Sequence, residues 1–182
     1  MLKSKIRKKI LNIRKKKNKY NTQIKFIKFY NLLKKITNLR NKIIGGYYPV
    51  NHEIEDLEIL EELERKKITI SLPRIRKNFK MNFVKCSMND PFIINRYGIP
   101  EPSSEKIVFP DILLVPLVAF DKNLNRLGYG AGYYDRLIQS LKKRKKIITI
   151  GLAFDFQEFY SIPISQHDQK LDYILTDKDI LQ

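Results

Sequence analysis

One stretch, residues 110–136, constrains this chain more than any other. It begins with an apolar run, residues 112–120, whose length suits a buried strand. A turn rich in Asp and Asn follows, and then three glycines stand at alternate positions between residues 128 and 132. The segment after them, around residues 137–141, is typical of a helix. Strand, glycine loop and helix together present backbone N–H groups and a helix N-terminus to an anion such as phosphate.

The glycine spacing alone is a modest indicator of function. Its pattern, G-x-G-x-G, matches neither the dinucleotide fingerprint nor the P-loop, so a structural turn without a ligand is an alternative. The flanking side chains favour the phosphate interpretation, because Arg126 precedes the glycines and Asp135 follows them. A guanidinium suits phosphate oxygens, and a carboxylate suits a divalent cation.

Length and composition indicate a globular protein. We expect residues 1–182 to form a single domain, because 182 residues with 43% apolar content can bury a sizeable core. The single cysteine, Cys86, excludes an internal disulfide and fits a reducing compartment. No apolar stretch is long enough for a signal peptide or a membrane span. We therefore expect a cytoplasmic monomer with no membrane partner.

The net charge of +17 is concentrated at one end of the chain. Residues 1–45 hold 13 Lys and 3 Arg without any Asp or Glu, whereas the remainder holds 20 basic and 19 acidic residues. Such a block can bind a polyanion, or it can be the solvated face of helices. We favour solvated faces. A nucleic-acid-binding protein remains the alternative, supported by charge alone.

The order of the predicted elements indicates the fold class. Apolar spacing predicts helices over residues 2–17, 21–43 and 52–65. Strands are predicted over residues 68–72, 79–84, 112–120, 147–154 and 173–175. Gly45-Gly46 is expected to stop the second helix and Pro73 to end the first strand, while residues 89–102 form a loop with one short element. This alternation predicts an α/β three-layer fold, a largely parallel sheet covered by helices on both faces.

Six blocks of sequence, in order, resemble one known family. They are Lys3-x-x-x-Arg7, Glu53 shortly after Tyr48, Leu72-Pro73-Arg74 followed by Met81-x-Phe83, the run YGIPEP from Tyr97 to Pro102, RLGYGAGYYDR from Arg126 to Arg136, and Asp168-x-x-Leu171-Asp172. Together they are similar to the motifs of the 5-formyltetrahydrofolate cyclo-ligases, also called methenyltetrahydrofolate synthetases. The resemblance covers nearly the whole chain.

This resemblance implies an enzyme that uses ATP and Mg²⁺ to convert 5-formyltetrahydrofolate into 5,10-methenyltetrahydrofolate. It implies two catalytic residues, Arg126 and Asp135, and two metal ligands, Asp135 and Asp168. The implied ATP-binding residues are Lys3, Arg7, Arg126, Gly128, Gly130, Gly132, Tyr133 and Tyr134. The implied folate-binding residues are Tyr48, Glu53, Tyr129, Gly130 and Tyr133. Core packing is the alternative for Tyr133 and Tyr134.

The chain departs from the family pattern at three positions. Ala131 stands where the family usually has a lysine, and Leu117 and Asn125 stand where it usually has glycine. Asparagine tolerates positive φ, so we expect Asn125 to preserve the turn. Ala131 removes a cation that would face phosphate, and a folate-binding relic with weak turnover is therefore a further alternative.

Overall fold

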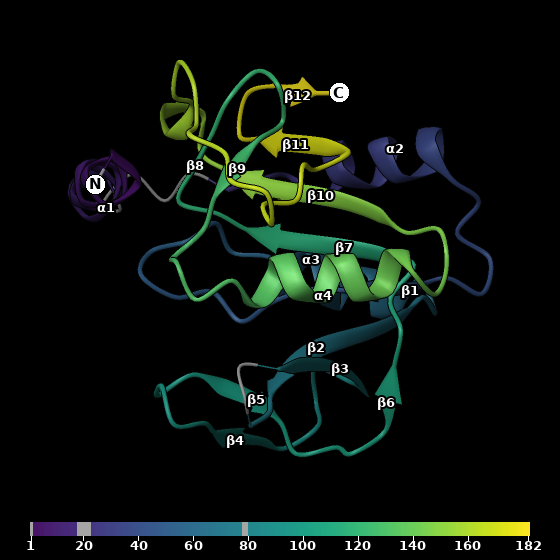
Figure 1. Ribbon diagram of the computed structural model, residues 1–182. Helices are drawn as coiled ribbons and strands as arrows, with labels where there is room; N and C mark the ends of the chain where they lie inside the picture. The colour runs from purple at the N-terminus through teal and green to yellow at the C-terminus, as the bar shows by residue number, and fades with distance from the viewer. Residues whose placement is uncertain (1, 18–22, 78–79) are drawn as a thin grey trace.

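A computed structural model describes residues 2–17, 23–77 and 80–182 (Figure 1). Over these residues the main sheet has eight strands, in the order β12-β11-β10-β7-β1-β2-β3-β6. Neighbours from β11 through β2 are parallel, whereas β3, β6 and β12 are antiparallel to their neighbours. The bounds are β1 Ile43–Gly45, β2 Thr69–Ile75, β3 Met81–Cys86, β6 Ile107–Val108, β7 Ile112–Pro116, β10 Ile148–Ala153, β11 Tyr173–Thr176 and β12 Ile180–Leu181.

Helices cover both faces of this sheet. Helices α2 (Phe26–Ile36) and α3 (Leu57–Arg65) lie on one face and α4 (Tyr133–Lys142) on the other (Figure 1). Successive strand residues alternate between two cores: Ile112 and Leu114 pack with α2 and α3, whereas Leu113 and Val115 pack with α4. Helix α1 (Leu2–Lys17) packs against a third, smaller cluster. The predicted three-layer α/β fold is confirmed.

The predicted strand over residues 112–120 is in fact two strands. Strand β7 ends at Pro116, and β8 (Ala119–Phe120) leaves the main sheet to pair with β9 (Arg126–Leu127). The N–H of Val118 donates to the carbonyl of Leu127 at 2.7 Å, which begins the new ladder. A continuous apolar run did not reveal this division, because both strands are buried.

The second helix is shorter than predicted. It ends at Ile36, Leu39 lies in a loop, and Ile43 opens the central strand β1. Gly45 therefore ends a strand and does not stop a helix. An added Cβ at Gly45 would lie 2.6 Å from a ring carbon of Phe83, so only glycine fits beneath that side chain. Residues 21–22, where we predicted the helix start, lie outside the described residues.

Other boundaries shift for local backbone reasons. Helix α3 begins at Leu57 and not at residue 52, because Asn51 and His52 adopt φ values of 50° and 59° in a left-handed turn. We predicted that Pro73 would end strand β2, but the strand continues to Ile75. Its pairing with β1 stops at Ser71, so beyond that residue one edge needs no N–H donor.

Three shorter features also differ from the prediction. Helix α4 begins at Tyr133, four residues before the predicted segment. The loop over residues 89–102 holds a hairpin of two strands, β4 (Phe92–Ile94) and β5 (Pro100–Pro102). Strand β12 and the short 3-10 helix η2 (Asp155–Gln157) were not predicted. Within the described ranges, no helix is long and apolar enough to cross a membrane.

Candidate active site

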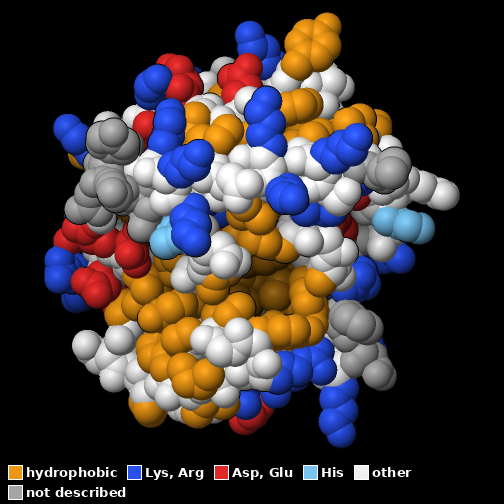
Figure 2. All heavy atoms as spheres, turned by 90° about the vertical axis from the view of Figure 1, so that its left-hand side faces the viewer, with side chains coloured by type: hydrophobic (Ala, Val, Ile, Leu, Met, Phe, Trp, Pro, Cys, Tyr) orange, Lys and Arg blue, Asp and Glu red, His pale blue; other side chains and the backbone are white. Residues whose placement is uncertain are grey.

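A pocket of about 740 Å³ opens at the carboxyl ends of strands β1, β2 and β7. Ile75 and Pro116, the last residues of β2 and β7, lie in its wall, and the loop after β1 adds a further side. In parallel sheets, ligands bind at this end of the strands. Figure 2, which views the molecule from the side of α1, shows a hollow with a hydrophobic lining and Lys and Arg side chains gathered above it.

The structure brings every sequence-predicted site residue to this pocket. Helix α1 contributes Lys3 and Arg7, the β1–α3 loop contributes Tyr48 and Glu53, and β9 contributes Arg126. The glycine loop contributes Gly128, Tyr129, Gly130 and Gly132, helix α4 contributes Tyr133, Tyr134 and Asp135, and the loop before β11 contributes Asp168. Residues separated by more than 160 positions thus share one cavity. Their individual roles remain predictions.

The glycine loop takes backbone conformations that require glycine. Gly130 has φ 112°, and Gly132, at the N-terminus of α4, has φ 68°. The Nε atom of Arg7 donates to the carbonyl of Gly128 at 2.7 Å, which ties α1 to the loop. A Cβ at Gly130 would lie 3.4 Å from the Arg7 guanidinium carbon. The loop therefore presents its backbone beside the Arg7 cation.

The turn before the glycine loop is held by a buried carboxylate. Asp121 accepts hydrogen bonds from the backbone N–H groups of Asn123, Asn125 and Ile162. The predicted role of Asn125 is wrong in detail, because Leu124, with φ 64°, is the residue that takes positive φ. Asn125 instead donates its side-chain amide to Asp121 at 3.1 Å. The turn is kept, and it delivers Arg126 to the pocket.

Two ion pairs join the predicted phosphate-binding cations to the predicted metal ligands. Both terminal nitrogens of Arg126 donate to Oδ1 of Asp135, at 3.1 and 2.9 Å, and Lys3 Nζ lies 2.5 Å from Asp168 Oδ2. The Arg126 side chain is 3% exposed, so its charge depends on Asp135. Burial alone would raise the pKa of Asp168, but hydrogen bonds from Lys3 and the Ser165 backbone outweigh burial and leave this pKa lowered.

The donor set fits a cation bound mainly through phosphate. Among the described residues, no group of three or more His, Cys, Asp or Glu side chains could hold a metal ion. The candidate ligands are therefore two carboxylates, Asp135 and Asp168. Burial lowers the pKa of Arg126, and the negative charges of both carboxylates oppose this effect. Mg²⁺ is typically held by one or two carboxylates together with substrate phosphates and water, so these residues suit it.

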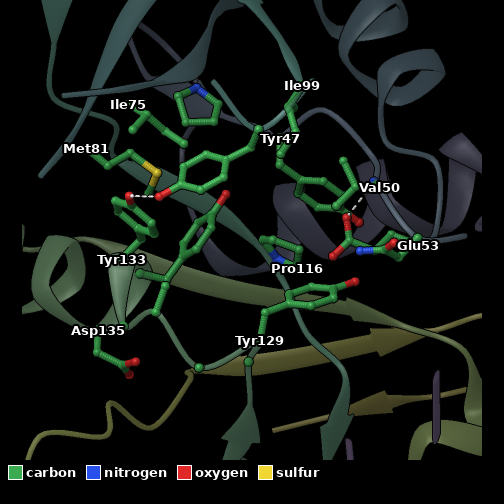
Figure 3. A pocket seen from close by; sticks show the side chains of 18 of the residues that line it. Tyr47, Val50, Glu53, Ile75, Met81, Ile99, Pro116, Tyr129, Tyr133 and Asp135 are labelled. Atoms are coloured by element: carbon green, nitrogen blue, oxygen red, sulfur yellow. Dashed lines mark hydrogen bonds between the residues drawn. The ribbon is translucent and has the colours of Figure 1, made fainter. Parts of the chain in front are cut away.

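The other half of the pocket is aromatic and apolar. Tyr47, Tyr133, Ile75, Ile99 and Met81 surround it in Figure 3. The hydroxyl of Tyr133 lies 3.0 Å from that of Tyr97, in the hairpin β4–β5. Sequence reasoning assigned no site role to Tyr47, Met81 or Tyr97, although the last two belong to the motifs that carried the resemblance. For Met81 and Tyr97, membership of these motifs is the sequence signal that could have identified them as pocket residues.

Glu53 carries a buried oxygen without a partner. Its Oε2 accepts the backbone N–H of Val50 at 2.8 Å, and among the described residues its Oε1 accepts no hydrogen bond (Figure 3). Burial raises the pKa of Glu53 to about 7, while the Val50 N–H, the charge of Arg14 and the Tyr129 hydroxyl act in the opposite direction. An unpaired acceptor at a pocket wall is a site for a ligand N–H donor.

This pKa leads to a prediction about pH. Between pH 4.5, the ordinary value, and about 7, the folded state keeps a proton on Glu53 that the unfolded chain has released. Folding therefore binds a proton, and rising pH favours unfolding through this group. We expect the melting temperature of ligand-free wild type to fall relative to that of Glu53→Gln across this interval, and the difference to level off above it. Parallel curves in thermal melts from pH 4.5 to 8 would contradict the assignment.

Comparison with known proteins gives a consistent result. A sequence model of the 5-formyltetrahydrofolate cyclo-ligase family matches residues 1–177. The chain is 35% identical over 141 residues to the 5-formyltetrahydrofolate cyclo-ligase of Haemophilus influenzae, covering 74% of this chain and 75% of that protein. It is 39% identical over 148 residues to the mouse (Mus musculus) enzyme of the same name, covering 74% and 73% respectively.

Solved structures are similar over nearly the whole chain. The NMR structure of a 5,10-methenyltetrahydrofolate synthetase from Aquifex aeolicus superposes with a TM-score of 0.81 at 30% identity, over 100% of this chain and 93% of that one. A 5,10-methenyltetrahydrofolate synthetase from Mycoplasma pneumoniae gives a TM-score of 0.74 at 26% identity, over 98% and 100%. The similarity therefore includes the fold as well as the sequence.

Proposed function

Because the chain belongs to the 5-formyltetrahydrofolate cyclo-ligase family and is a ligase of folate one-carbon metabolism, we propose a specific reaction for it. It converts 5-formyltetrahydrofolate into 5,10-methenyltetrahydrofolate and consumes ATP. One observation carries the proposal. A single pocket joins an aromatic half, with the unpaired Oε1 of Glu53, to a glycine loop flanked by the cations Lys3, Arg7 and Arg126.

The chemistry needs activation of a poor leaving group. The formyl oxygen attacks the γ-phosphorus of ATP, the bond to the β-phosphate oxygen breaks, and ADP departs. N10 of the folate then attacks the formyl carbon and loses its proton, and the C–O bond breaks to release phosphate. Positioning and neutralisation of charge are sufficient for phosphoryl transfer, so no protein nucleophile is required.

The cations have the right chemistry to bind the ATP phosphates. Arg126 has a planar, buried guanidinium that suits two-point contact with phosphate, and Arg7 lies beside Gly130. The N–H groups of the glycine loop and the N-terminus of α4 would add donors. Arg136, whose Nη2 donates to the carbonyl of Ala131 at 2.7 Å, supplies a positive charge next to that position.

Asp135 and Asp168 are the residues that would hold Mg²⁺. When bound, the ion supplies positive charge that stabilises phosphoryl transfer. Asp135 is also hydrogen-bonded by the backbone N–H of Gln169 at 3.0 Å, and Asp168 by that of Ser165 at 2.7 Å. These contacts fix the carboxylates before any ligand arrives, which lowers the cost of assembling the site.

Glu53 and the aromatic residues suit the pterin ring. The Oε1 atom of Glu53 would accept ring N–H groups, while Tyr48, Tyr129 and Tyr133 line the same cavity. Stacking and apolar contact hold a flat heterocycle in such a pocket, and the carboxylate fixes its orientation.

The test is near-ultraviolet absorbance of the protein mixed with 5-formyltetrahydrofolate, ATP and Mg²⁺. We expect the absorbance of the conjugated methenyl product to rise, and the rise to vanish when ATP is omitted. Folate binding without product would identify a binding relic. Absence of both would refute the proposal and favour the polyanion-binding alternative, which a steep salt dependence of RNA binding would then support.

A further inference from the structure

One cation of α1 is placed unlike the lysines around it. Arg14 is 1% exposed and is among the largest fully buried side chains in the described part of the chain. Its Nη1 donates to the hydroxyl of Tyr129 at 2.8 Å, and its Nη2 donates to the carbonyl of Leu117 at 2.5 Å. The guanidinium therefore connects α1 to the chain between β7 and β8 and to the glycine loop.

Burying a guanidinium is costly unless its charge is paired and its N–H groups are hydrogen-bonded. Two of its nitrogens have partners, but among the described residues Nε has none. The partners named above, a hydroxyl and a carbonyl, carry no charge. The charge of Arg14 lowers the pKa of Glu53, against the larger effect of burial. A positive charge is thus buried next to the pocket, although Arg14 itself does not line it.

Tyr129 forms the connection between the two. Its hydroxyl accepts the hydrogen bond from Arg14 and interacts with the Glu53 carboxyl. Figure 3 shows Tyr129 and Glu53 entering the pocket from different elements, the glycine loop and the β1–α3 loop. The hydrogen bond from Arg14 therefore ties α1 to a tyrosine that lines the same pocket as Glu53.

We propose that Arg14 is a positioning residue: through its hydrogen bond to Tyr129 and its buried charge, it holds the Glu53 carboxyl in place at the folate end of the pocket. The inference rests on the proposed function, because it takes Glu53 as the acceptor of pterin N–H groups. Its effect is specific to one substrate, since the ATP end of the pocket uses other cations.

The groups around Glu53 show why a cation is needed there. Those that face it are Tyr47 and Asp56 before α3, Tyr134 on α4, Tyr129 in the glycine loop and Arg14 on α1. Asp56 is fully buried, and burial is the main cause that raises its pKa well above the usual value. Within this described set Arg14 is the sole cation. Its removal should move the ionisation of Glu53 to higher pH.

The experiment compares Arg14→Met with Lys15→Met, which removes the same charge from an exposed neighbour on the same helix. Folate affinity is measured by calorimetry from pH 6 to 9, and KM is measured for both substrates. We expect Arg14→Met to raise KM for 5-formyltetrahydrofolate about tenfold, equivalent to about 1.4 kcal/mol, and to leave KM for ATP within about twofold. The pH below which folate binding weakens should also rise. Lys15→Met should match wild type in every measurement.

Two further variants make the outcome decisive if Arg14→Met does not fold. Tyr129→Phe removes the connecting hydroxyl and should raise KM for folate alone. Arg14→Lys keeps the charge and should retain the wild-type pH dependence while weakening folate binding. Wild-type values in both variants, or equal changes in the two KM values, would overturn the role of Arg14. A wild-type enzyme that neither binds nor converts folate would instead refute the proposed function.

Discussion

Replacing Asp135 with asparagine is expected to lower kcat for methenyl formation by about 10²–10³-fold, the range seen when one charge-stabilising group is removed from an active site. Asparagine keeps the size of the side chain but removes the charge that balances Arg126, which is 3% exposed. Under the proposed function it also removes a ligand of Mg²⁺. The Mg²⁺ concentration for half-maximal activity should therefore rise as well.

A matched substitution separates this effect from the loss of any acidic side chain. Glu105 pairs with Arg74 and Arg76 on the surface and does not line the pocket. Glu105→Gln should leave kcat and the Mg²⁺ dependence unchanged. Thermal melts of both variants show how much of the effect comes from unfolding, because an unbalanced buried charge also destabilises a fold. A kcat within twofold of wild type for Asp135→Asn would exclude Asp135 from the reaction.

Gly130→Ala is expected to have the second large effect. The φ value of 112° at Gly130 is one that side-chain-bearing residues rarely adopt, and an added Cβ would also meet Arg7 at 3.4 Å. We expect a loss of about 1–3 kcal/mol in the free energy of unfolding, the usual cost of such strain. A change in the backbone at Gly130, which lies beside Arg7, should raise KM for ATP in the fraction that remains folded.

The neighbouring glycine provides the comparison. Gly128 has no positive φ, and nothing lies within 4 Å of an added Cβ. Gly128→Ala should therefore leave the free energy of unfolding within about 0.5 kcal/mol of wild type. Chemical denaturation of both variants tests this contrast. Equal stabilities would mean that the loop at Gly130 relaxes without cost.

Local sequence patterns predicted the interior elements well and their boundaries poorly. The strand over residues 147–154 and the helix over residues 2–17 are close to β10 and α1. The helix predicted to residue 43 failed because Ile43 and Ile44 continue a helical spacing yet pair with β2 and β7 in the sheet. Periodicity cannot distinguish a short buried strand from one more helical turn.

The candidate site was more predictable than the element boundaries. Arg126, the glycines and Asp135 lie within ten residues of sequence, so their chemistry could be recognised together. Lys3 and Asp168 could be connected with them only through the family resemblance. The ion pair between these two residues, which are 165 positions apart, results from folding and not from any local pattern.

The basic N-terminal block shows the limit of counting charges. By composition, Lys3, Arg7, Arg14 and Lys15 are equivalent, and solvated helix faces were the favoured interpretation. The structure places Lys3 and Arg7 in the pocket wall and buries Arg14, whereas Lys15 is exposed. A helix face is defined by what packs against it, and here the side chains of Lys3, Arg7 and Arg14 donate hydrogen bonds to residues 117–129 and 165–168.

Local patterns in the chain were sufficient to predict the fold class, which the structure confirms, and to propose the chemistry of the site, because alternating apolar segments and a compact motif are local properties of the chain. The tertiary structure alone decided which cations serve the pocket, how Glu53 comes to have an unpaired oxygen, and why Leu124 takes the turn conformation expected of Asn125. These features depend on burial and on contacts between distant segments. Burial sets the cost of a charge and the pKa of a carboxyl, and it exists only once the chain has folded.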